Sequence, residues 1–285
     1  MKSVYRERRW FCGNYLEVNI FPVFAGQKGR GKKKKPTSEV QARLNEHNAE
    51  QQLIRILNEN FTGKDYEIHL TYRDENLPQT PDRVKRDVQN YIRRVKRARV
   101  RQGLPPMKYV IVPAGGIDGT RYHVHITMSG GIDRTLLEEL WGYGYANSRC
   151  LQFNENGVEG LARYVSRQFS AHKGELPFGK RWSGSRNLVI PEPHDRDGRL
   201  SHRRVQELAA MTVNVPAVLE ELYAGYTYAE CRPFHNDVNG GYYLHVKMYR
   251  TGAVFQNTKR RKQKKREVSV RHEAVTIDQK NGQTG

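Results

Sequence analysis

Residues 121–128 read Arg-Tyr-His-Val-His-Ile-Thr-Met, a stretch in which polar and apolar side chains alternate. Such alternation is typical of a β-strand with one buried face. Because successive side chains on a strand point to opposite faces, His123 and His125 share one face, and Val124 lies on the other. The apolar run at 109–112 precedes this stretch, with a Gly-rich turn between them, which predicts an antiparallel hairpin.

The two histidines on one face of this strand predict a metal site. Imidazole nitrogens ligate Mn, Zn, Ni and similar ions, and a phosphate oxygen can complete such a site. A second alternating strand is predicted at 66–72, with Glu67 and His69 on a shared face. If both strands belong to one sheet, either of these two residues is a candidate additional ligand. The alternative is that all four are polar residues on an exposed sheet face.

A long helix is predicted between Thr80, a favourable N-cap, and Gly103, a favourable stop signal. Its apolar residues recur at helical spacing, and nine Arg or Lys residues lie between Arg83 and Arg101. This basic surface is either solvated or faces DNA. Under the second interpretation, the candidate DNA-binding residues are Arg86, Arg93 and Arg97.

A second helix, predicted at about 158–170, supplies a candidate nucleophile. Tyr164 falls at the flank of the apolar stripe of this helix, where its hydroxyl can hang over a metal on a neighbouring sheet. Arg167 follows one turn later, within reach of the same phosphate. A tyrosine with an ordinary pKa of about 10 is a weak nucleophile at pH 7, so a metal and an arginine would have to stabilise its phenolate.

Composition favours a nucleic-acid partner. The 285 residues include 49 Lys or Arg against 30 Asp or Glu, a formal net charge of +19, which favours contacts with phosphates. Three widely spaced cysteines fit a reducing cytoplasm. The sequence has no apolar run near the ~20 residues that cross a bilayer and no phosphate-binding loop of an ATPase, so we expect a soluble, intracellular protein without a fused helicase.

The remaining patterns predict an α+β fold, with an antiparallel sheet and helices packed on one face, plus a smaller C-terminal α+β extension. We expect four segments along the chain. They are a basic N-terminal arm and helix at 1–60, a core at 61–172, an accessory region at 173–255 and a basic, disordered tail at 256–285.

Taken together, four motifs resemble those of the HUH-type endonucleases, in particular the replication-associated proteins of small phages and other rolling-circle elements. Residues 70–78 (Leu-Thr-Tyr-Arg-Asp-Glu-Asn-Leu-Pro) look like the first motif, and 122–126 (Tyr-His-Val-His-Ile) match the His-hydrophobe-His motif. Residues 163–167 (Arg-Tyr-Val-Ser-Arg) are similar to the nucleophile motif. Residues 181–188 (Arg-Trp-Ser-Gly-Ser-Arg-Asn-Leu) resemble a stretch that follows it.

The resemblance implies a nickase that uses Mg or Mn. Tyr164 would form a covalent 5′-phosphotyrosine with single-stranded DNA at a replication origin, and a polymerase would extend the free 3′-hydroxyl. A separate helicase would open the duplex, and the setting would be the cytoplasm of a bacterial host. Three arginines in or beside the motifs, Arg163, Arg181 and Arg186, are further candidate DNA contacts.

The sequence departs from the family pattern at two points. Arg167 stands where the family prefers lysine, which keeps the charge but changes its geometry. Many relatives also carry a glutamate on the strand before the histidine motif, whereas here the first carboxylate after that strand is Asp118. Asp118 and Glu67 are therefore both candidates for a third ligand, and this ligand stays unassigned.

Two other functions compete with the nickase interpretation. His69-Leu-Thr and His125-Ile-Thr together resemble the two-histidine phosphoesterases, which use such motifs without a metal. A non-catalytic nucleic-acid-binding protein would explain the charge and the aromatic-rich strands, whose rings can stack on bases. Metal dependence excludes the first alternative, and a covalent protein–DNA adduct excludes both.

Overall fold

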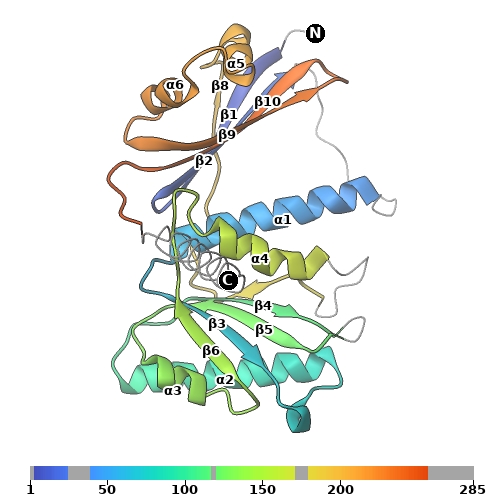
Figure 1. Cartoon of the computed structure of the whole chain (residues 1–285), viewed down its shortest axis with the longest axis vertical. Coiled ribbons are helices and arrows are strands. Elements are labelled where there is room, and N and C mark those ends of the chain that lie inside the picture. Colours follow the sequence, from blue (N-terminus) through green and yellow to red (C-terminus); the bar gives the residue numbers. More distant parts are fainter. Residues whose placement is uncertain (1–2, 25–38, 117–119, 171–178, 256–285) are drawn as a thin grey trace, which may run out of the picture. The chain divides into compact units, whose positions relative to one another are not determined.

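The computed structural model describes residues 3–24, 39–116, 120–170 and 179–255, with the side chains of 39–40 and 167–170 left out of the description. In these ranges the chain forms two five-stranded antiparallel sheets and six α-helices (Figure 1). This arrangement confirms the predicted α+β class. The described residues as far as Ala253 belong to one compact unit.

The first sheet brings together strands from both ends of the compact unit. Its strand order is β8-β1-β2-β10-β9. The strands are β1 (Ser3–Cys12), β2 (Tyr15–Phe24), β8 (His194–Asp197), β9 (Tyr226–Asn236) and β10 (Gly241–Arg250). Two helices, α5 (His202–Ala209) and α6 (Val215–Leu222), pack on one face of this sheet and share a buried apolar cluster with it.

The second sheet carries the histidines and has the order β6-β3-β5-β4-β7. Its strands are β3 (Tyr66–Thr71), β4 (Tyr109–Ala114), β5 (His123–Met128), β6 (Ala146–Cys150) and the two-residue β7 (Ser183–Gly184). The predicted hairpin at 109–128 is confirmed, because β4 and β5 pair antiparallel. A short 3-10 helix (Asp74–Asn76) follows β3.

Helices cover both faces of the second sheet, not one as predicted. Four helices are involved: α1 (Glu39–Asn60), α2 (Pro81–Arg101), α3 (Arg134–Glu139) and α4 (Glu159–Ser170). On one face, α2 and α3 share a cluster with β3 and β5. On the other face, α1 and α4 share a cluster with Val110 and Val112 of β4, and Figure 1 shows the two helix pairs on opposite sides of the sheet. The prediction failed because β4 presents apolar side chains to both faces.

The ends of α2 follow from its sequence. Thr80 has an extended backbone, and its side chain accepts a hydrogen bond from the amide N of Arg83. Pro81 occupies the first turn, where a missing N–H costs nothing. Gly103, just beyond the helix, has a φ of +65°, a left-handed conformation that favours glycine. The predicted N-cap and stop signal are therefore confirmed.

The predicted segment boundaries at 60 and 172 do not match the sheets. Residues 3–24, expected within a basic arm, form β1 and β2 and pair with β10. The expected accessory region thus shares one sheet with the N-terminus, which corrects the predicted C-terminal extension. The sequence pattern near Cys150–Phe153 also predicts a strand, but the strand of this region, β6, lies earlier in the chain. The basic run at 28–35 and the tail at 256–285 lie outside the described residues.

Candidate metal centre

Three histidines meet on the face of the second sheet that α4 covers. His69 of β3 lies directly opposite His125 of β5 in the antiparallel register, and their rings stack with centroids 4.6 Å apart. The ring of His123 meets these two edge-on, at centroid distances of 5.3 and 5.4 Å. One ring nitrogen from each histidine lies within 4.8 Å of the others, so the three can hold one metal ion.

The hydrogen bonding of the rings leaves nitrogens available for such an ion. His123 Nδ1 lies 3.0 Å from the backbone oxygen of Arg121, so it is placed to donate a proton there and leave Nε2 as a lone-pair donor. His69 Nε2 and both ring nitrogens of His125 are buried, and among the described residues they have no hydrogen-bond partner. Buried polar atoms without partners are costly, and a bound cation would relieve that cost.

The electrostatic environment keeps two of the rings neutral. Burial and the adjacent His125 and His123 lower the pKa of His69 to about 4. Burial also lowers the pKa of His123, and the bond to the Arg121 carbonyl only partly opposes this shift. Neutral imidazole is the form that ligates metals, so these two histidines do not need to lose a proton near pH 7 before an ion binds.

Glu67 lies beside the cluster but is not part of it. Its carboxylate is buried, accepts a hydrogen bond of 2.5 Å from Arg149 Nε, and places Oε1 3.7 Å from His125 Nδ1, beyond hydrogen-bond length. Burial raises the pKa of Glu67, but His125 and Arg149 lower it by more, so the net pKa lies below its ordinary value. Glu67 therefore places a negative charge beside His125 without forming a hydrogen bond to it. Of the predicted candidates for an additional ligand, His69 joins the histidine pair.

Tyr164 extends from α4 over the same cluster. Its ring meets the ring of His125 edge-on, with centroids 5.4 Å apart, and the residue is 49% exposed. Val158, Ala162 and Val165, at and beyond the start of α4, are buried against α1 and β4, and this packing turns Tyr164 towards the histidines. The predicted flank position is therefore confirmed. The side chain of Arg167 lies outside the described residues.

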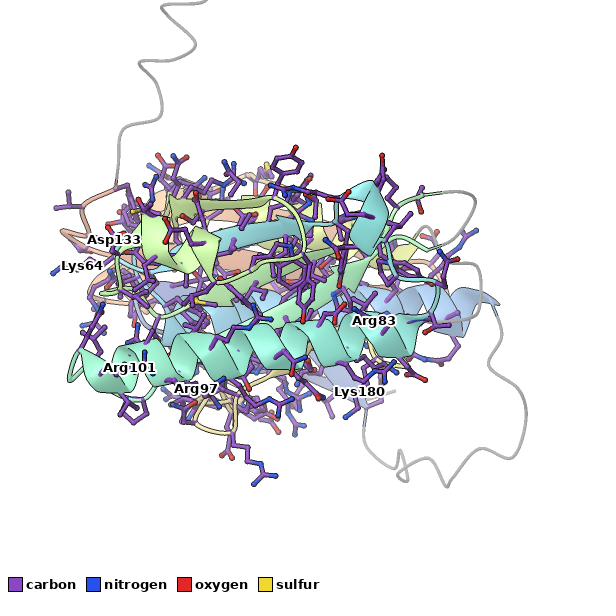
Figure 2. All side chains as sticks on the ribbon, turned by 90° about the horizontal axis from the view of Figure 1, so that it is seen from below. Lys64, Arg83, Arg97, Arg101, Asp133 and Lys180 are labelled. Carbon is purple, nitrogen blue, oxygen red and sulfur yellow. The ribbon has the colours of Figure 1, made fainter. Side chains whose placement is uncertain are left out.

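The basic face of α2 lies away from the histidine cluster. α2 packs on the opposite face of the sheet, and Arg86, Arg93 and Arg97 are exposed there. Figure 2 shows this helix with Arg97 and Arg101 along it. The structure therefore does not bring these three predicted DNA contacts together with the histidines and Tyr164.

The other predicted DNA contacts lie on α4 and beside β7. Arg163, on α4, forms ion pairs with Glu159 and Glu50. Arg181 and Arg186 flank β7 at the edge of the sheet; Arg186 is exposed, whereas Arg181 is half-buried. Asp118 lies outside the described residues.

Sequence reasoning missed Arg149, the residue that holds Glu67. It lies on β6, directly opposite Glu67 in the register of β3 and β6. Its strand was predicted too late in the chain, so the pairing was hidden. A periodicity of two from Ala146 to Cys150 was the one available signal, but the polar Ser148 at the buried position weakens its apolar contrast.

Within the described ranges, no helix combines the length and the apolar character that crossing a membrane requires. Comparisons with protein-family models, with curated proteins and with solved structures give no match for this chain. The geometry of the site therefore carries the functional argument.

Proposed function

We propose that this protein is a metal-dependent nickase of the HUH type, which transfers a phosphodiester of single-stranded DNA to Tyr164 at a replication origin. The observation that carries this proposal is the convergence of His69, His123 and His125 on one point, with the Tyr164 ring against His125. The +19 charge of the chain supports an anionic polymer as substrate.

The residues present fit a divalent cation. Within the described part of the chain, buried nitrogens of His69 and His125 have no hydrogen-bond partner, and the contact of His123 Nδ1 with the Arg121 carbonyl leaves Nε2 as a lone-pair donor. Imidazole donors suit Mn²⁺, whereas Mg²⁺ prefers oxygen ligands and retains its waters, so of the two ions we expect Mn²⁺ to bind more tightly. When bound, the ion stabilises negative charge on a phosphate oxygen as a Lewis acid.

The chemistry assigned to Tyr164 balances as a phosphoryl transfer. Its hydroxyl oxygen forms a bond to phosphorus, while the bond from phosphorus to the 3′-oxygen breaks. The phenolic proton goes to solvent and the departing 3′-oxygen takes up a proton, which leaves a 3′-hydroxyl end. The reverse reaction rejoins the strand and frees Tyr164. Arg167, one turn further along α4, is proposed to neutralise charge on the phosphate.

The test uses a random-sequence pool of single-stranded DNA, labelled at either end, with Mn²⁺ or with EDTA. In the proposed reaction the 3′ label moves to a denaturation-resistant protein band, while the 5′ label is released on a shorter fragment. The band should disappear with EDTA and in Tyr164→Phe and His125→Ala. Tyr145→Phe is the matched control, because Tyr145 is an exposed tyrosine on the same domain, and it should keep the adduct.

The outcomes separate the alternatives. If DNA binds but no adduct forms with any metal, the binding-protein function replaces the nickase. An adduct that persists in Tyr164→Phe would assign the nucleophile to another residue. We further propose that a separate helicase and polymerase act with this protein, in the cytoplasm of a bacterial host.

One observation favours a second candidate. His69 and His125 face each other directly, as the two histidines of a two-histidine phosphoesterase would. Such an enzyme needs neither His123 nor Tyr164. Hydrolysis of a 2′,3′-cyclic phosphate that survives EDTA and Tyr164→Phe, but not His69→Ala, would support it.

A further inference from the structure

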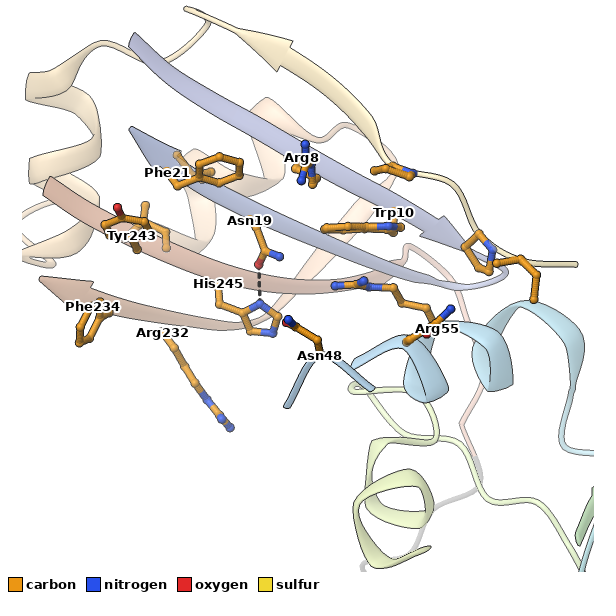
Figure 3. Close-up of a pocket in the computed structure, with 16 residues that line it drawn as sticks. Arg8, Trp10, Asn19, Phe21, Asn48, Arg55, Arg232, Phe234, Tyr243 and His245 are labelled. Carbon is orange, nitrogen blue, oxygen red and sulfur yellow. Dashed lines mark hydrogen bonds between the residues drawn. The ribbon is translucent and has the colours of Figure 1, made fainter. Parts of the chain in front are cut away.

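The first sheet has a second face that α5 and α6 do not cover. The apolar residues of this sheet that pack on those helices all lie on the opposite face. On the uncovered face, α1 and the segment at 190–193 border a pocket of about 680 Å³ (Figure 3). Its floor consists of side chains from β1, β2, β10 and β9, and none of these residues belongs to the metal centre.

Aromatic side chains form one row across this floor. Phe21 lies on β2, Tyr243 on β10 and Phe234 on β9, and Tyr243 pairs directly with Phe234 in the strand register. Figure 3 shows the three rings at the same end of the pocket. Phe234 is 63% exposed and the other two rings are half-buried. The Arg8 guanidinium lies over the Phe21 ring, 5.6 Å from its centroid, so Phe234 and Tyr243 offer the open ring surface. Open aromatic faces on a sheet are a platform on which unpaired bases stack.

The next row along the strands is polar and basic. In register across the sheet it reads Arg8, Asn19, His245 and Arg232. Arg232 is exposed and pairs with Glu230, and Arg8 pairs with Asp195, both through contacts that remain partly open to solvent. The single contact between Arg232 and Glu230 is of the exposed kind that contributes little stability, so the Arg232 guanidinium can contact a phosphate at low cost. Arg8 keeps its two hydrogen bonds to Asp195.

His245 and Asn19 form a polar pair at the centre of this row. His245 Nδ1 lies 2.7 Å from Asn19 Oδ1, as drawn in Figure 3. Burial lowers the pKa of His245, so its ring is neutral at pH 7. With Nδ1–H donated to Asn19, Nε2 remains as an acceptor that can receive a hydrogen bond from the edge of a base.

We propose that this face of the first sheet is a second binding site for single-stranded DNA, in which bases stack on Phe234 and Tyr243, beside Phe21, and Arg232 contacts the backbone. The aromatic row beside a basic row matches the alternation of base and phosphate in a single strand. Paired bases do not expose the faces that such a row binds, so duplex DNA is excluded. The strongly positive chain selects a polyanion over a second copy of itself.

The choice of DNA over RNA rests on the proposed function, whereas the stacking site does not. In a nickase the site would hold a part of the strand away from Tyr164. The binding test therefore uses a Tyr164→Phe background in EDTA, where no transfer takes place. If no adduct forms in the nickase assay, this binding measurement still stands. If the binding measurement fails, the result of the adduct assay still stands.

The experiment measures fluorescence anisotropy of a labelled oligothymidylate of about 12 nucleotides at fixed salt, with the full chain. Replacing Phe234 and Tyr243 together by alanine should weaken binding about 10-fold or more, since each stacked base contributes on that scale. Phe11→Ala is the matched control. Phe11 is 42% exposed and adjacent to Trp10 on β1, so it points to the opposite face, and its loss should leave binding unchanged.

A crosslinking arm keeps the test independent of mutant folding. The protein with all three aromatic residues intact is irradiated together with an oligonucleotide that contains 5-bromodeoxyuridine. The crosslinked peptides should contain Phe21, Phe234 or Tyr243. Equal affinity of the double variant and the control, or crosslinks confined to other peptides, would overturn the proposal. Tighter binding of a matched oligouridylate through these residues would also overturn it. The same holds if the double variant dissociates a dimer of the protein while its DNA binding is unchanged.

Discussion

His69 differs from the other two ligand candidates in that it comes from a different strand. Because β3 and β5 pair with His69 opposite His125, its ring completes a cluster that the His-x-His pair alone leaves open. We expect His69→Ala to lower Mn²⁺ affinity by about 100-fold or more, since a direct ligand matters at least as much as an outer-shell partner, whose loss costs about 10–100-fold. Isothermal titration calorimetry measures this.

The control for that titration is His47→Ala, which removes an exposed histidine of α1 outside the cluster. It should bind Mn²⁺ as the parent protein does. Equal affinities of the two variants would remove His69 from the metal centre and leave His123 and His125 to bind the ion with another group.

Glu67 acts one step away from the ion. Its buried carboxylate accepts a hydrogen bond from Arg149 and lies 3.7 Å from His125 Nδ1, so its negative charge acts on that ring without a direct hydrogen bond. We expect Glu67→Gln, which keeps the shape but removes the charge, to weaken Mn²⁺ binding by about 10-fold. The same titration, with circular dichroism to verify folding, checks this. An unchanged affinity would show that Glu67 only balances the charge of Arg149.

For single residues, the sequence predicts which side chains lie on the same face of a strand, but not which side chains of different strands lie next to each other. Alternation alone places His123 and His125 together, and Glu67 and His69 together. Choosing His69 over Glu67 requires the register between β3 and β5, which no local pattern encodes. Arg149 requires the register of a third strand, β6.

Among the elements, α2 was the most predictable because its cap, apolar stripe and terminal glycine all agree. β1 was missed because its inward positions include the buried Glu7, and Val4 and Phe11 are exposed, so the apolar alternation is broken. β9 was missed for a related reason, since most of its residues remain at least partly exposed. Neighbouring strands supply the burial and hydrogen bonds that these two segments do not signal locally.

β8 is an edge strand that pairs antiparallel with β1, and ion pairs join the same two strands. Arg8 donates two hydrogen bonds to Asp195, and Arg6 donates two to Asp197. The hydrogen bonds from Arg8 lower the pKa of Asp195, and those from Arg6 lower the pKa of Asp197. A carboxyl whose folded pKa is lowered stabilises the fold above its unfolded pKa of about 4 and loses that contribution as the pH falls through its folded pKa.

We therefore expect β8 to loosen in acid before the rest of the sheet. Hydrogen exchange of a peptide spanning 194–197 should be slower in the parent protein than in Asp195→Asn/Asp197→Asn at pH 7. This difference should vanish once the pH is well below about 4. Peptides from α2 serve as the internal reference. A difference between the two proteins that persists undiminished in acid would mean that backbone pairing, not the ion pairs, holds β8.

For the molecule as a whole, the first sheet was the least predictable feature. Its central pairing joins β2 to β10, whose residues are more than 200 positions apart in the sequence. The alternation of Leu16, Val18 and Ile20 with polar residues predicts one short strand, and the run from Tyr242 to Tyr249 predicts another. The pairing of such distant segments is set by global packing. The predicted boundaries at 60 and 172 failed for this reason.

A buried ion cluster links the first sheet to the helix that carries Tyr164. Lys247 of β10 is fully buried and donates hydrogen bonds to Glu159, at the start of α4, at 2.6 and 2.7 Å. It also donates one of 3.0 Å to Glu230 of β9. Replacing Lys247 by methionine would leave the buried Glu159 carboxylate without its main counter-charge, although Arg163 still contacts it.

We expect Lys247→Met to lower the free energy of unfolding by about 3 kcal/mol, as breaking a buried ion pair on one side typically does. Urea denaturation measures this, and Arg203→Met, which removes an 89% exposed partner of Glu207, should cost less than about 1 kcal/mol. Adding Glu159→Gln to Lys247→Met should recover part of the loss, because no buried carboxylate remains unpaired there. If Lys247→Met is as mild as the control, water or Arg163 must satisfy Glu159. In that case the position of α4, and with it of Tyr164, would depend on the apolar contacts with α1 and not on the first sheet.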